Sequence, residues 1–356
     1  MALTQVPNEL LEIGVKAFGT SSFMIGDTTT GTIDAANYNI GLGVDVFESL
    51  NTGDSNIAIG HQALYSNTSG SQNVGIGHAA LYNNSTASYN TAVGYFAMIA
   101  NTTGSENTAV GYQALDAPTT GANNTAMGSG ALGANTTGAR NTGLGKNALL
   151  VATTAIENTA VGNQALVDVT TGSQNTGMGH AALYELTTGN YNTSVGSNSM
   201  QNTTTASSNT AMGYNALGSN TTGAANVAIG YAALDASSTV NNTVAVGFAA
   251  LSNTTVNHNT ALGHQALETC TTGEHNTAVG INSVARSTTG YSNTGVGSGS
   301  GIDITTGYYN ICVGHNAGNN ITTGALNTIV GSNANVGYAN AGCLVLGYGN
   351  DVTSGS

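Results

Sequence analysis

Five of the seven histidines and five of the twenty Tyr and Phe residues occupy one recurring position, the residue after a repeated glycine. We call this position the aromatic row; in chain order it carries His61, His78, Tyr95, Tyr112, Ser129, Lys146, Asn163, His180, Ser197, Tyr214, Tyr231, Phe248, His264, Ile281, Ser298, His315 and Ser332. If the repeats stack, these side chains stand about 4.8 Å apart. Stacked rings stabilise such an array. An exposed strip of rings instead suits sugar binding, for which the candidates are Tyr95, Tyr112, Tyr214, Tyr231 and Phe248.

Other chemistry has weaker support in the sequence. His61 and His78 are the one adjacent histidine pair of the row, which is a poor basis for a metal site. Enzymes that cleave glycosides use two carboxylates beside one bond, whereas the acidic residues here are scattered along the repeats. Asp116 and Asp235 share the residue after a leucine row but lie seven repeats apart. We therefore expect no enzymatic activity, no metal and no cofactor.

Composition excludes several kinds of partner. The net charge is −13 and four residues are basic, namely Lys16, Arg140, Lys146 and Arg286. Such a chain neutralises few phosphates, so we expect no nucleic-acid partner. No apolar run approaches the roughly 20 residues of a membrane span. The N-terminus lacks the basic start and apolar centre of a signal peptide, which predicts synthesis in the cytoplasm.

The aromatic row belongs to a repeat with the consensus N-T-A-V-G-x-x-A-L-x-x-x-T-T-G-x-x. Its asparagine recurs in steps of seventeen from Asn39 to Asn226, then after one step of sixteen at Asn242, and in steps of seventeen again from Asn259 to Asn327. Two glycines and several β-branched residues per repeat oppose a helix. Short strands between Gly and Asn turns fit better. The repeat predicts an all-β chain that folds as a parallel β-solenoid of about 18–20 coils.

Each consensus position has an expected role. The asparagines can bond to their own equivalents in the next coil, and the glycine permits a turn with positive φ. Within the strand, Val110 and its equivalents must face away from Ala109 and its equivalents. We expect the Val and Leu rows to fill the coil. The opposite face would then carry small residues and line a trimer axis: Ala109, Ala126, Ala160, Ala211, Ala228 and Ala278.

Two resemblances follow from these motifs. The stretch N-T-V-A-V-G, Asn242–Gly247, resembles the head repeat of trimeric autotransporter adhesins, which implies a parallel β-roll with three chains packed side by side. The run N-T-A-V-G-Y-Q-A-L, Asn107–Leu115, followed by Thr119-Thr120-Gly121, resembles bacteriophage tail-fibre and other virion fibre proteins more closely. That resemblance implies a homotrimeric fibre on the outside of a virion.

The resemblance also implies an organisation and partners. Residues 1–25 would attach the fibre to other virion proteins, 26–338 would form the solenoid, and 339–356 would form a C-terminal cap or tip. Host attachment would use a cell-surface glycan or protein, bound by the aromatic row or by the tip from Gly331 to Ser356. The alternatives are the head of a bacterial surface adhesin and an ice-binding solenoid, since regular Thr rows resemble ice-binding surfaces.

Overall fold

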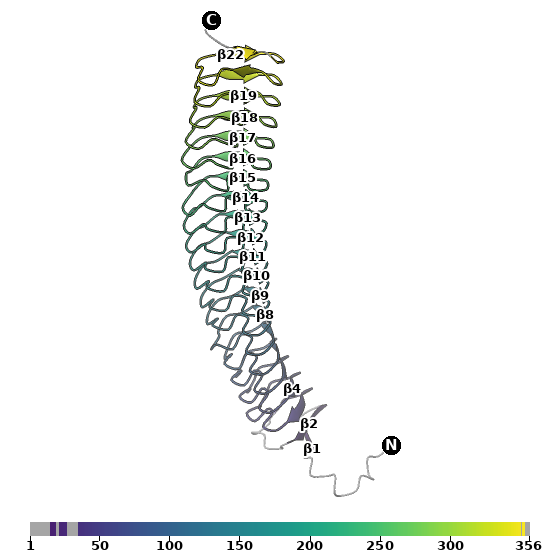
Figure 1. Cartoon of the computed structure of the whole chain (residues 1–356). Coiled ribbons are helices and arrows are strands. Elements are labelled where there is room, and N and C mark those ends of the chain that lie inside the picture. The colour runs from purple at the N-terminus through teal and green to yellow at the C-terminus, as the bar shows by residue number, and fades with distance from the viewer. Residues whose placement is uncertain (1–14, 19–20, 27–34, 350, 353–356) are drawn as a thin grey trace, which may run out of the picture. The chain divides into compact units, whose positions relative to one another are not determined.

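The computed structural model describes residues 15–18, 21–26, 35–349 and 351–352. They divide into two compact units, Met1–Gln174 and Asn175–Ser356. In each unit the described chain winds into successive coils, and each coil contributes a short strand to one stack (Figure 1). Among these residues no helix is present, so none is long and apolar enough to cross a membrane. Most of the expected attachment segment, 1–25, lies outside the described residues.

The first unit begins with an antiparallel pair and continues as a parallel ladder. Strand β1, Val15–Phe18, pairs antiparallel with β2, Ser22–Gly26, which pairs in parallel with β3, Ile40–Gly43. Each later strand pairs in parallel with the one before it, seventeen residues earlier. These strands are β4 (Ile57–Ile59), β5 (Val74–Ile76), β6 (Thr91–Val93), β7 (Thr108–Val110), β8 (Thr125–Met127), β9 (Thr142–Leu144) and β10 (Thr159–Val161).

The second unit repeats the same parallel ladder. Its strands are β11 (Thr176–Met178), β12 (Thr193–Val195), β13 (Thr210–Met212), β14 (Val227–Ile229), β15 (Val244–Val246), β16 (Thr260–Leu262), β17 (Thr277–Val279), β18 (Thr294–Val296), β19 (Ile311–Val313), β20 (Thr328–Val330) and β22 (Leu344–Leu346). Two further strands, β21 (Asn335–Val336) and β23 (Asp351–Val352), pair separately. The predicted all-β parallel solenoid is confirmed in each unit. In the stack, parallel pairing extends beyond the 26–338 interval, to Phe23 and to Leu346.

The one irregular step of the repeat differs from the sequence-based alignment. Val244 pairs with both Val227 and Thr260, so Thr243 takes the place of the motif asparagine. Its backbone N–H donates to Oδ1 of Asn226 at 3.1 Å. The missing residue therefore falls between Thr243 and Asn259. The alignment on Asn242 was wrong because that asparagine has φ 53° and fills the turn before the strand.

A buried ladder of asparagine side chains joins the coils. In the first unit, Oδ1 of Asn56 accepts the backbone N–H of Asn73 at 2.9 Å, and Nδ2 of Asn56 donates to the carbonyl of Gly70 at 2.9 Å. Nδ2 of Asn73 also donates to Oδ1 of Asn56, at 3.1 Å. The expected bond between equivalent amides is thus present. Because both asparagines are fully buried, each bond satisfies a polar group that water cannot reach.

The core of each coil combines the leucine row with the middle residue of each strand. Ala114 and Leu115 are both fully buried although they are consecutive, whereas consecutive side chains of an extended strand would point to opposite faces. Leu115 has φ 52°, and this left-handed conformation turns its side chain inward. The leucines at this position repeat the conformation along both units. Such residues are strained, and we infer that burial of the leucine side chain offsets the strain.

The expected orientation of the strands is reversed. Ala109, Ala126, Ala160, Ala211, Ala228 and Ala278 are all fully buried inside their own coils. They cannot line a trimer axis. Space decides the orientation: a Cβ added to Gly75, at this same position, would stand 3.3 Å from Cγ of Leu64. Around Gly75 the interior therefore admits about one methyl group, and most strands accordingly carry Ala or Gly here and direct the larger Val-type side chains outward. Cys312 and Ile329 occupy this position in β19 and β20 and are also buried.

Replacing one ladder asparagine should destabilise the neighbouring coils. Asn209→Ala leaves the N–H of Asn226 without its acceptor at 2.9 Å and removes one of the two donors to the carbonyl of Gly223, which keeps Nδ2 of Asn220 at 3.0 Å. One buried N–H without a partner costs about 1–3 kcal/mol. We expect faster amide hydrogen exchange in the coils around Asn209 and a lower urea midpoint. Asn202→Ala is the control, since this half-buried side chain lies outside the ladder; equal effects for the two variants would contradict the role of the ladder.

The glycine that ends each strand should be intolerant of alanine. Gly213 has φ 134°, and a Cβ there would stand 2.4 Å from the carbonyl oxygen of Gly230 in the next coil. We expect Gly213→Ala to lower the thermal midpoint strongly, because the clash is with backbone. Gly218→Ala in the same coil is the matched control. Its Cβ would meet the side-chain oxygen of Asp235, which can rotate away, so a similar loss in both variants would refute this explanation.

Candidate functional site

The aromatic row forms a ring ladder in the first unit. The rings of His61 and His78 meet edge to face with centroids 5.1 Å apart, as do those of His78 and Tyr95 at 4.9 Å. Tyr95 and Tyr112 are stacked, with centroids 5.6 Å apart and planes inclined by 10°. The next member of the row is Ser129, so the ladder ends at Tyr112.

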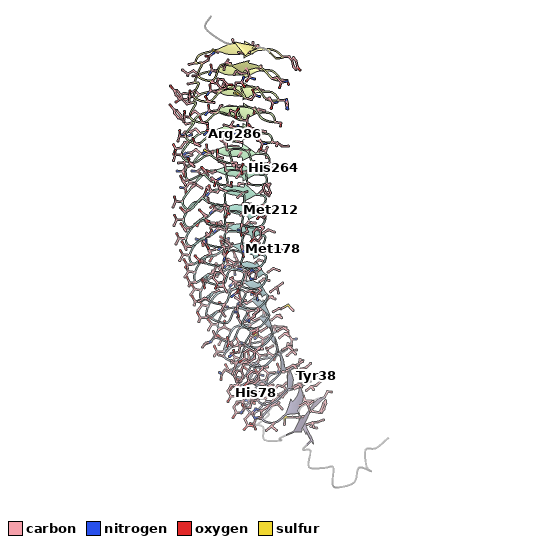
Figure 2. The ribbon with its side chains drawn as sticks, in the orientation of Figure 1. Tyr38, His78, Met178, Met212, His264 and Arg286 are labelled. Atoms are coloured by element: carbon pink, nitrogen blue, oxygen red, sulfur yellow. The ribbon has the colours of Figure 1, made fainter. Side chains whose placement is uncertain are left out.

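A second ring ladder lies in the second unit. Tyr214 stacks on Tyr231 at 5.4 Å, Tyr231 on Phe248 at 5.2 Å, and Phe248 on His264 at 5.1 Å. The structure thus brings together Tyr95 with Tyr112, and Tyr214 with Tyr231 and Phe248. His264 is labelled on the second unit in Figure 2.

The ring ladders expose edges rather than faces. Rings stacked 5.1–5.6 Å apart already contact one another. A sugar ring that packs on an aromatic face therefore has no access between them. About half of each side chain is still exposed, as in Tyr112 at 53% and Tyr231 at 52%. Free ring faces are left only where a ladder ends.

The histidine pair gives no support to a metal site. His61 and His78 lie edge to face, and Nε2 of His61 lies 3.7 Å from Oδ2 of Asp45. Among the residues that the structure describes, no group of three or more His, Cys, Asp or Glu side chains is arranged to hold a metal ion. Nδ1 of His78 is buried and has no hydrogen-bond partner.

Several charged side chains pair with the next coil. Nε of Arg140 donates to Oε1 of Glu157 at 2.9 Å, and Arg286 pairs with Asp303. In each pair the acid follows the arginine by seventeen residues, so the bridge joins equivalent positions of neighbouring coils. These exposed pairs add little stability, about 0–1 kcal/mol. Among the described residues, no cation forms a salt bridge with Asp116 or Asp235, and burial raises the pKa of both carboxyls.

The cysteines are free thiols. Burial raises the pKa of Cys270 to about 11 and that of Cys312 to about 12. Both thiols are therefore protonated at neutral pH, which makes them poor nucleophiles. Both side chains lie in the core, where they act as small apolar residues.

The main exposed apolar feature is a row of strand side chains that we had expected inside the coil. We call the third residue of each strand the outer strand row. In the first unit it comprises Leu42, Ile59, Ile76, Val93, Val110, Met127, Leu144 and Val161, and in the second Met178, Val195, Met212, Ile229, Val246, Leu262, Val279, Val296, Val313, Val330 and Leu346. Met178 and Met212 are labelled in Figure 2. Met212 is 43% exposed. The first residue of each strand, usually Thr, faces the same side.

Further ring pairs lie outside the aromatic row. Tyr65 stacks on Tyr82 at 4.8 Å, and Tyr291 on Tyr308 at 5.0 Å. His258 and His275 stack at 5.1 Å, each directly before a motif asparagine. All three pairs can be recognised in the sequence, because the two rings of each pair are one repeat of seventeen residues apart. Most other repeats carry no ring at the same positions.

A comparison of the sequence with models of known protein families gives no match, and a comparison with curated proteins gives none either.

The raised pKa of Asp235 predicts a pH-dependent effect on stability. Its carboxylate lies close to Gly218 of the preceding coil, where partial burial disfavours the negatively charged form. The folded-state pKa thus exceeds the unfolded value, so this group lowers the free energy of unfolding as pH rises above about 4. We expect Asp235→Asn to raise the thermal midpoint at about pH 7 but not at about pH 3, where Asp235 is protonated. An equal gain at both pH values would exclude titration as the cause.

Proposed function

We propose that this chain is a non-enzymatic structural fibre of a bacteriophage particle, and that it attaches the particle to the host surface. The observation that carries the proposal is the unbroken repetition of one coil, which places the same side chains at equal intervals along each unit. Such an array suits a spacer better than a single reactive site. The resemblance of Asn107–Leu115 to virion fibre repeats supports the same assignment.

The proposed fibre is a homotrimer that packs through the outer strand row. This row is apolar in every coil of both units and is accompanied by the first strand residues, usually Thr. Continuous apolar patches on soluble proteins commonly mark interfaces. The strands are mostly three residues long, so each copy offers a narrow face. Three such faces can meet about one axis with all chains parallel, as a fibre fixed at one end requires.

The proposed partners follow from this arrangement. The N-terminal segment, 1–25, joins other virion proteins, and the remainder of the fibre extends from the particle toward a host glycan or protein. Immunogold labelling of purified particles with an antibody to the chain tests the assignment. Label at external fibres is the expected result. Label confined to a bacterial surface would instead favour the adhesin head.

Ice binding is the second candidate, because the strands themselves carry a Thr row. Thr108, Thr125 and Thr142 occupy equivalent, partly exposed positions on neighbouring strands. A flat strand face suits ice better than the turns in which the Thr-Thr pairs lie. Thermal hysteresis in a dilute solution of the chain would support this alternative. We expect none, because the same face is covered in the proposed trimer.

A charge in the outer strand row should disrupt the trimer without unfolding the coils. Met212 is 43% exposed, whereas its strand neighbour Ala211 is fully buried. We expect Met212→Asp to shift sedimentation from trimer to monomer while the β-type circular dichroism persists. Ala211→Asp should instead lose ordered structure, because it buries an unpaired charge. A wild-type chain that sediments as a folded monomer near 35.3 kDa would refute the trimer.

A further inference from the structure

We infer that a surface notch in the first unit binds one pyranose ring of a neutral saccharide. The notch has a volume of about 410 Å³ and lies over the coil that carries Ser129, Gly130 and Gly133. Small-molecule sites span about 300–1,000 Å³. The inference adds a ligand to the proposed attachment function and rests on that function for its biological use, while the notch itself is defined by geometry.

The notch exists because three outward positions of one coil carry small residues, namely Ser129, Gly130 and Gly133. Ser129 is the small member of the aromatic row between Tyr112 and Lys146. Gly130 lies between Gln113 and Asn147 of the flanking coils, and Gly133 lies between Asp116 and Leu150. Coils on both sides therefore form walls, and the backbone of the coil between them forms the floor.

The walls carry polar groups that are available to a ligand. In the part of the chain that the structure describes, the side chains of Gln113, Ser129 and Asn147 have no hydrogen-bond partner, and the carboxylate of Asp116 is bonded only to its own backbone amide. Two of these groups reach over the glycines. A Cβ on Gly130 would stand 2.8 Å from Oδ1 of Asn147, and one on Gly133 would stand 3.4 Å from Oδ1 of Asp116. A carboxylate, two amides and a hydroxyl can together accept from and donate to several sugar hydroxyls.

The same notch has an apolar side. Ala134, Leu150 and Val151 contribute aliphatic surface to its lining. A pyranose combines a C–H face with a rim of hydroxyls, which matches aliphatic surface beside acceptors and donors.

Charge favours a neutral ligand. Asp116 provides a carboxylate in the wall, and the chain carries a net charge of −13, so a nucleotide or another phosphorylated ligand is repelled. An uncharged polyol needs no further compensation.

The second unit contains an incomplete version of this arrangement. Gly218 has an aspartate at the equivalent position of the next coil, Asp235, whereas Gly133 has one at the equivalent position of the preceding coil, Asp116. There, however, Asn215 takes the place of Gly130, and Tyr231 covers the ring of Tyr214. An Asp–Gly pair alone is therefore insufficient, and the notch requires all three small residues in one coil.

Saturation-transfer NMR on the full chain tests the inference. The probes are the methyl pyranosides of glucose, galactose, mannose and N-acetylglucosamine at millimolar concentration. We expect transfer to at least one of them, and binding weakened about tenfold or more by Asp116→Asn, which removes a charged acceptor. The double variant G130N/G133L copies Asn147 and Leu150 of the next coil into the notch, and S129Y puts a large ring at the lining position Ser129. Both should abolish transfer.

The matched control is Gly299→Asn in the second unit, which fills the equivalent of Gly130 in a coil that already carries Ile302. Unchanged thermal midpoints should accompany all variants used for interpretation. The inference is overturned if no probe receives transfer from the wild-type chain, or if transfer persists in G130N/G133L and S129Y. These outcomes are independent of particle labelling: a chain that binds sugar but is absent from particles refutes the fibre proposal alone, and the reverse result refutes the notch alone.

Discussion

Each coil must be compatible with a near copy of itself one strand spacing away. Parallel pairing at a seventeen-residue offset places every side chain beside its own equivalent. A row can then hold only residue types that pack or hydrogen-bond favourably against the same residue type in the next coil. Asparagine satisfies this requirement because its amide both donates and accepts. Asn56 accepts from the backbone N–H and the side-chain amide of Asn73, and it donates to the carbonyl of Gly70. Leucine and aromatic rings satisfy it by packing. Like charges do not, and the arginines at 140 and 286 accordingly precede acids at the same position.

The repeat made most of the architecture predictable. Its period, its glycines and its asparagines indicated coils, turns and an inter-coil amide ladder, and the structure contains all three. The leucine row was also placed correctly in the core. Period-2 alternation separated Val110 from Ala109 but did not say which side was interior. That depends on how far the leucines of the opposite wall reach, as the 3.3 Å approach to Cγ of Leu64 shows at Gly75. A clue was nevertheless present: the middle strand position is mostly Ala or Gly, while the outer one varies freely among Val, Ile, Leu and Met. Close-packed interiors restrict volume in the first way, and surfaces do not.

The candidate site was less predictable, for a related reason. The aromatic row was visible as a pattern, but its usefulness to a ligand depends on where the pattern stops. Within a ladder the rings cover one another, and Tyr231 is an example. Tyr112 differs only because Ser129 follows it. The notch likewise requires Gly130 and Gly133 in that same coil, and its walls come from the preceding and following coils, which lie beside these residues only after folding. In a repetitive scaffold, binding specificity is therefore expected at defects in the repetition rather than in the consensus.

The coil that begins at Thr243 shows where such a scaffold tolerates a change of length. It is one residue shorter than its neighbours, yet Val244 keeps its pairing on both sides. The deletion is absorbed in the turns between Thr243 and Asn259, and the strand stack continues without a shift. In this coil the turns accommodate the loss of one residue, whereas loss of a whole repeat would remove one layer and leave every remaining coil beside an equivalent partner. Length can thus drift in steps of a coil while the lateral surface stays the same.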